Sequence, residues 1–149
     1  MFEFPLSDQR KPSDGIALVG RLAYRRSMPA PAINSATISN LRALGGKDAG
    51  FLREIVTIFL SDMPARIAEL EAGLAAGETE KFVRAAHSIK GSAANLGATR
   101  LQGAAERLEN RALQFGTAPA GTPLAEIIGE FARARRELES LLEAEKAQR

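Results

Sequence analysis

One histidine, His87, is the residue of this sequence best suited to nucleophilic chemistry. The chain has 149 residues, a single histidine and no cysteine, so cysteine nucleophiles, disulfides and thiolate metal sites are excluded. Neutral imidazole is a good nucleophile near neutral pH and forms covalent intermediates. Lys90 follows three positions later, where its charge would lie beside the oxygens of a phosphoryl group on His87. The residue types and their spacing are therefore suited to phosphoryl transfer.

The apolar residues around His87 predict a helix, from about residue 79 to residue 95, that leaves the imidazole exposed. At about 100° per residue, one buried stripe forms. It consists of Phe82, Ala86, Ile89, Ala93 and Leu96. His87 lies about 140° from the centre of that stripe, and Gly91 lies one turn beyond it. Glycine in the middle of a helix costs about 1 kcal/mol relative to alanine, and the close approach of a partner would explain it. Periodicity alone also fits an ordinary surface histidine.

Apolar residues spaced by three and four predict three further long helices and one short helix. The long helices are expected at residues 52–74, 101–115 and 124–142. The short helix is expected around residues 38–44, with Thr37 or Ser39 as its cap. Phe115 and Ile128 are placed on core faces. No segment alternates polar and apolar residues for long enough to be a strand. The predicted fold class is all-α, an antiparallel up-down four-helix bundle with a short extra N-terminal helix.

The sequence divides into two parts of different character. Residues 1–33 contain four prolines and no sustained periodicity, and we expect a flexible or loosely docked N-terminal tail. Residues 34–149 form the predicted bundle domain. Met28 directly precedes Pro29, which leaves open whether the reading frame starts there.

The charge distribution argues against a nucleic-acid surface. Residues 1–33 hold five Lys or Arg against three Asp or Glu, and the remaining residues hold fifteen of each sign. A nucleic-acid interface would show basic residues gathered on one face. No apolar run approaches the roughly 18–20 residues that span a bilayer, and the apolar run at residues 16–20 is too short for a signal peptide. We expect no membrane insertion and a cytoplasmic location.

The run at residues 86–98, AHSIKGSAANLGA, resembles the signature of histidine phosphotransfer (HPt) domains, A-H-x-[LIF]-K-G-[SA]-[SA]-x-x-[LIV]-G, without a gap. The similarity extends over about residues 36–145. It implies that His87 is phosphorylated through Nε2, that Lys90 contacts the phosphoryl oxygens, and that Gly91 leaves room for a receiver domain.

The resemblance also implies roles for residues around the motif. Glu109, on the next helix, would bind the other imidazole nitrogen and fix the tautomer, although an ordinary solvated glutamate is the alternative. Arg84, Ser88 and Arg111 are further candidates for contacts with the phosphate. Docking is expected on the ridge around His87 and on the adjoining faces of the second and fourth helices.

The family implies a phosphoryl carrier without ATP-dependent kinase activity of its own. Its partners would be the receiver domains of a hybrid histidine kinase and of response regulators, and the Mg²⁺ would be on the receiver. The chain is expected to be a monomer with no cofactor or metal of its own, because one histidine without cysteine cannot assemble the usual zinc or di-iron sites. Two alternatives stay open: a non-catalytic helical interaction module, and a scaffold or dimerisation bundle without phosphate chemistry. The sequence names neither the kinase nor the regulator, nor the direction of transfer.

Overall fold

A computed structural model of the chain describes residues 30–118 and 121–147. The predicted tail, residues 1–33, therefore lies almost entirely outside the described residues. A compact unit begins at Ala32. The described part contains five helices and no strand, which confirms the all-α class. The helices are α2 (Ser35–Gly45), α3 (Phe51–Ala76), α4 (Thr79–Leu96), α5 (Thr99–Phe115) and α6 (Gly121–Ala147).

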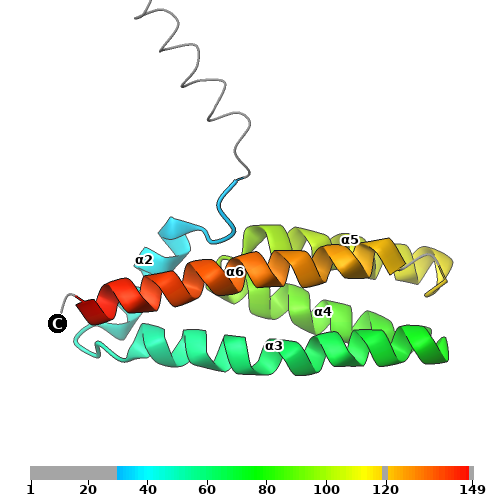
Figure 1. Cartoon of the computed structure of the whole chain (residues 1–149), viewed down its shortest axis with the longest axis horizontal. Helices are drawn as coiled ribbons and strands as arrows, with labels where there is room; N and C mark the ends of the chain where they lie inside the picture. Colours follow the sequence, from blue (N-terminus) through cyan, green and yellow to red (C-terminus); the bar gives the residue numbers. More distant parts are fainter. Residues whose placement is uncertain (1–29, 119–120, 148–149) are drawn as a thin grey trace, which may run out of the picture. The chain divides into compact units, whose positions relative to one another are not determined.

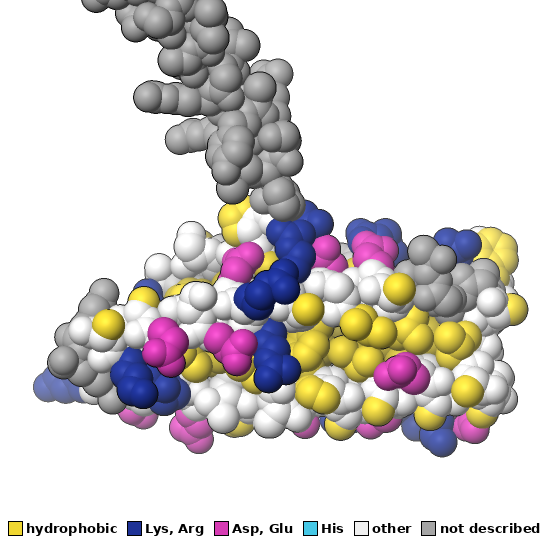
Figure 2. All heavy atoms as spheres, in the orientation of Figure 1, with side chains coloured by type: hydrophobic (Ala, Val, Ile, Leu, Met, Phe, Trp, Pro, Cys, Tyr) yellow, Lys and Arg dark blue, Asp and Glu magenta, His cyan; other side chains and the backbone are white. Residues whose placement is uncertain are grey.

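The four long helices α3 to α6 lie side by side, and the short α2 lies near one end of them (Figure 1). Helix α4 packs against both α3 and α5, while α6 closes against α5 and α3. Figure 2 shows a face on which apolar side chains gather between α3 and α6, and no histidine is visible there. None of the helices in the described ranges is long and apolar enough to cross a membrane.

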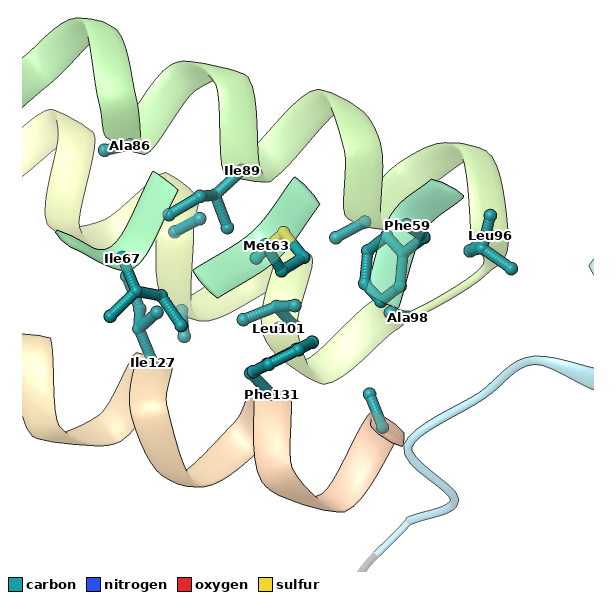
Figure 3. Packing of buried hydrophobic residues seen from close by; sticks show 14 of the residues in the cluster. Phe59, Met63, Ile67, Ala86, Ile89, Leu96, Ala98, Leu101, Ile127 and Phe131 are labelled. Carbon is teal, nitrogen blue, oxygen red and sulfur yellow. The ribbon is translucent and has the colours of Figure 1, made fainter. Parts of the chain in front are cut away.

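The core is built from the apolar stripes that the sequence predicts. Met63 of α3, Leu101 of α5 and Phe131 of α6 point toward one another in Figure 3. Phe59 meets Phe131 edge to face, with 6.0 Å between ring centroids, a favoured aromatic geometry. The core placements of Phe115 and Ile128 are wrong, because both side chains are exposed. Phe115 is the last residue of α5, and at Ile128 the neighbouring Ile127 takes the buried position.

The start of the helical unit also differs from the prediction. Asn34 caps α2, and its side-chain oxygen accepts the backbone N–H groups of Ala36 and Thr37 at 2.8 and 3.2 Å. The caps predicted at Thr37 and Ser39 are therefore wrong, because both residues lie inside the helix. Ala32 and Ile33, expected in the tail, are buried.

A carboxylate on α6 accounts for the burial of these two residues. The backbone N–H groups of Ala32 and Ile33 donate to Glu137 at 2.8 and 3.0 Å. Burying backbone donors is costly unless they find acceptors, and Glu137 supplies one for each. Because that carboxylate is more than 100 residues away in the sequence, local patterns do not reveal it.

A tight turn at Gly97 sets α5 against α4. Gly97 is the predicted C-terminal glycine of α4 and has a φ of 74°, in the left-handed region that favours glycine. A β-carbon at Gly97 would lie 2.6 Å from that of Thr37, so no other residue fits without movement. The chain resumes as α5 two residues later, and α5 returns along α4.

Candidate functional site

His87 lies on the face of α4 that borders α5. Its side chain is 68% exposed, while the preceding Ala86 is fully buried in the core. The ring nitrogen Nδ1 lies 2.7 Å from Oε2 of Glu109 on α5. A hydrogen bond at Nδ1 leaves Nε2 as the nitrogen on the opposite side of the ring. The site therefore presents an imidazole that is held at one nitrogen and accessible from solvent.

Glu109 is the buried acceptor of this site. The residue is only 8% exposed, and each of its two oxygens has a partner. One accepts from His87, and the other accepts from Nζ of Lys90 at 2.6 Å. Glu109 is thus not the solvated surface residue considered as an alternative from sequence. Lys90 is held by Glu109, a contact that the sequence analysis did not predict.

The environment of Glu109 favours its ionised form. Burial by itself would raise the pKa of Glu109, but hydrogen bonds from Lys90 and His87 lower it, and the net pKa is below the ordinary value. The pKa of Lys90 is raised, chiefly by its hydrogen bond to Glu109. Both groups are therefore charged near neutral pH, and the carboxylate of Glu109 can only accept hydrogen bonds.

Gly91 leaves open space one turn after His87. Apart from its chain neighbours and the backbone of its own helix, a β-carbon placed there would have no heavy atom within 4 Å. The glycine is therefore not required by packing within the helical unit. Gly91 thus leaves open space beside His87, and its predicted role in partner access stays a prediction.

The other candidate phosphate contacts are not joined to this network by any hydrogen bond among the described residues. Arg84 pairs with Glu80 at 3.3 Å, one turn earlier on α4. Ser88 is half-buried. Arg111 is exposed and lies about 200° around α5 from Glu109, on the side where Arg107 pairs with Glu126 of α6.

A shallow groove lies between α3 and α4, the helix that carries His87. It has a volume of about 130 Å³, and its lining comes from both helices: Ile55, Ile58, Phe59, Asp62, Met63, Ser92, Asn95 and Leu96. Ile58 is 58% exposed. Sequence reasoning did not assign these residues to a surface groove, although the spacing of Ile55, Ile58 and Asp62 on one side of a helix was the available signal. Among the described residues, no group of three or more His, Asp or Glu side chains lies close enough to hold a metal ion.

Comparison with known proteins places the chain in a family. Residues 54–148 match the Hpt domain family, and the chain belongs to that family. This confirms the membership that the run at residues 86–98 indicated.

Individual relatives agree with this assignment. Over 78 residues the chain is 30% identical to the phosphorelay intermediate protein YPD1 of Candida albicans, covering 52% of this chain and 42% of the relative. The chain thus matches less than half the length of that curated relative. The structure of histidine-containing phosphotransfer protein ZmHP2 from maize superposes with a TM-score of 0.74 at 22% identity, covering 87% of this chain and 96% of that one. The structure of histidine-containing phosphotransfer protein B (HptB) of Pseudomonas aeruginosa PAO1 superposes with a TM-score of 0.67 at 27% identity, covering 75% of this chain and 95% of that one.

Proposed function

We propose that this chain is a phosphorelay intermediate that accepts a phosphoryl group on His87 from a receiver-domain aspartate and passes it to another receiver. The observation that carries the proposal is the 2.7 Å contact between Nδ1 of an exposed His87 and the buried Glu109 carboxylate. Two of the relatives named above, a phosphorelay intermediate and a histidine-containing phosphotransfer protein, support the same function.

The contact with Glu109 determines which nitrogen reacts. An ionised carboxylate accepts only, so Nδ1 of His87 carries the proton and neutral imidazole keeps its lone pair on Nε2. Nε2 attacks the phosphorus of the receiver's aspartyl phosphate, and the bond from phosphorus to the aspartate oxygen breaks. The aspartate leaves as a carboxylate, and the imidazole gains a positive charge that Glu109 stabilises. No proton moves, so the same step runs in reverse toward a second receiver.

Residues of α4 near His87 assist this step. Lys90 neutralises charge on the phosphoryl oxygens once it turns from Glu109 toward them, and Gly91 allows the receiver to come close. Arg84 and Ser88 are weaker candidates for phosphate contacts, and the position of Arg111 favours it least. The Mg²⁺ belongs to the receiver and would neutralise phosphoryl charge there.

We also propose a location, an oligomeric state and a helix arrangement for this protein. We place it in the cytoplasm as a monomer, with the antiparallel up-down arrangement predicted from sequence. The packing of α3 on α4, α4 on α5 and α5 on α6 supports that arrangement. Its partners are the receiver of a hybrid histidine kinase and those of response regulators. ATP-dependent kinase activity is assigned to the partner kinase, and this chain acts as the carrier.

A phosphoryl-transfer assay tests the proposal directly. Wild-type protein and a His87→Gln variant are incubated with a panel of phosphorylated receiver domains, and the intact masses are measured under non-acidic conditions. We expect one phosphoryl group on the wild type and none on the variant. Wild type that stays unlabelled with every receiver, or a variant that keeps the label, would overturn it.

Receiver binding that leaves no phosphoryl group on the protein would identify the main alternative, a non-catalytic interaction module. A non-catalytic interaction module would bind receivers equally well as wild type or as His87→Gln, and neither protein would carry phosphate. A scaffold or dimerisation bundle would bind no receiver at all. Glu109 lies behind His87 as an ionised carboxylate with a hydrogen bond to each oxygen. This arrangement favours phosphotransfer over the interaction module and the scaffold, because neither of them requires it.

A further inference from the structure

The apolar surface on the α5 side of His87 has no part in the chemistry proposed above. Leu113 is 67% exposed and follows Glu109 by four residues, so it lies one turn further along the same face of α5. Val83 precedes His87 by four residues on α4 and packs, half-buried, against the core. We call these two residues the Leu113 flank.

The register of α4 against α5 places Leu113 beside the site. At one end, His87 contacts Glu109. At the other end, a β-carbon at Gly116 would lie 3.7 Å from the hydroxyl oxygen of Thr79. Leu113 lies on α5 between these two contacts, where the helices stay side by side. Its exposed side chain therefore borders the surface from which a partner reaches the imidazole.

Two basic residues of α4 near this surface are paired within the protein. Lys90 is held by Glu109 at 2.6 Å, and Arg84 pairs with Glu80 at 3.3 Å. A surface that approaches His87 along the Leu113 flank thus meets two paired basic side chains and the exposed Leu113. That combination suits an apolar partner surface better than an acidic or a basic one.

A second exposed apolar residue stands on the other side of α4. Ile58 lines the groove between α3 and α4, whereas Leu113 lies on α5. The family resemblance already implies that the receiver docks on the ridge around His87 and on the adjoining faces of α3 and α5. We propose that Leu113 is a specificity-determining residue of this docking surface. It selects receivers with an apolar surface next to the phosphorylated aspartate. This inference rests on the proposed phosphotransfer function.

Kinetics of transfer with matched variants test this proposal. Leu113→Ala removes most of the apolar contact at an exposed position, and Leu113→Met retains it. Ile128→Ala removes an exposed apolar side chain from α6, which lies against α5 and α3. Each protein is assayed with a phosphorylated receiver and with phosphoramidate, a small phosphoryl donor that needs no docking surface.

We expect Leu113→Ala to raise the KM for the receiver roughly tenfold with little change in kcat. Leu113→Met and Ile128→Ala should match wild type, and labelling by phosphoramidate should be equal in all four proteins. An unchanged KM for Leu113→Ala, or an equal rise for Ile128→Ala, would refute the role of Leu113 while leaving phosphotransfer intact. Slower labelling of Leu113→Ala by phosphoramidate would place Leu113 in the chemistry and overturn the docking role. Wild type unlabelled by every receiver would overturn the proposed function and this inference with it.

Discussion

Glu109 is the residue on which the whole site depends. It supplies one oxygen to the reacting histidine and the other to the lysine that would hold the phosphoryl group. Before transfer, the carboxylate balances the charge of Lys90. After transfer, the phosphoryl oxygens compete for Lys90 while the new positive charge on the imidazole strengthens the bond from Nδ1 to Glu109. In the mechanism proposed above, a single carboxylate thus prepares the acceptor and stabilises the product.

Replacing Glu109 by glutamine tests this double role. The amide oxygen can still accept from Nδ1 of His87, but its negative charge is gone and Lys90 loses its ion pair. We expect the rate of labelling by phosphoramidate to fall about tenfold, since roughly 1.4 kcal/mol of charge stabilisation in the transition state corresponds to that factor. The rate is measured by intact mass at non-acidic pH.

A variant at the other partner separates the two contacts. Lys90→Gln leaves Glu109 with its bond to His87, so attack on phosphoramidate should be affected less than in Glu109→Gln. The yield or lifetime of the phosphohistidine should fall instead. If Glu109→Gln is labelled as fast as wild type, charge behind the imidazole is not part of the mechanism.

Among the helices, α4 carries the ridge on which we propose that transfer takes place, and the role of its Gly91 can be tested directly. A β-carbon at Gly91 meets nothing within 4 Å, and the same holds for Gly129 on α6. Both are helical glycines, so glutamine at either position should leave the fold intact and raise helix stability slightly. We expect Gly91→Gln to slow transfer from a receiver at least tenfold by obstructing docking, with labelling by phosphoramidate unchanged.

Gly129→Gln is the matched control for that experiment. It carries the same change in helix propensity and bulk away from α4, so its transfer rate should equal that of wild type. Equal rates for all three proteins would mean that access does not explain Gly91. Circular dichroism should show unchanged or slightly raised helicity for both variants.

Helix α4 is also the element that sequence predicts best. Its buried stripe, its exposed histidine and the terminal Gly97 all follow from a periodicity of 3.6 and a left-handed cap. The contact between Lys90 and Glu109 does not follow, because it depends on the register between α4 and α5. That register is set by the turn at Gly97 and by core packing, which no single helix encodes.

The start of α2 illustrates the same limit. Asn34 is a strong capping residue, but the apolar Ala32 and Ile33 before it lie at the end of a proline-containing stretch that reads as a tail. Their burial depends on Glu137, which comes from the opposite end of the chain. Exposure of Phe115 has a related cause, since the helical pattern continues past the last layer of the core.

At the scale of the whole helical unit, α6 holds the other helices together through carboxylates. Glu145 pairs with Arg42 of α2 at 2.8 Å, and Glu130 accepts from Arg100 of α5 at 2.8 and 3.0 Å. The pair between Arg100 and Glu130 has two hydrogen bonds, which is the stronger geometry for arginine and a carboxylate. These contacts join elements that are distant in sequence, and they depend on ionised glutamates.

Acid should therefore weaken the helical unit through Glu130 and Glu109. Hydrogen bonds from Arg100 hold the pKa of Glu130 below its ordinary value of 4.5, although burial opposes them, and the pKa of Glu109 is also lowered. Below pH 4.5 the unfolded chain then binds more protons than the folded one, so the free energy of unfolding falls with pH. The contribution is complete above pH 4.5 and is lost as the pH drops through the folded pKa values.

Urea unfolding followed by circular dichroism between pH 3 and pH 7 measures this effect. Glu130→Gln should lower the free energy of unfolding at pH 7 by about 1 kcal/mol and make its decline below pH 4.5 shallower than in wild type. Glu139→Gln is the control, because Glu139 is exposed and its pair with Arg135 is longer, at 3.6 Å. This variant should keep the wild-type pH dependence. A Glu130→Gln profile parallel to wild type at every pH would show that the ion pair with Arg100 does not link proton binding to folding, and the acid sensitivity would then have to arise elsewhere in the helical unit.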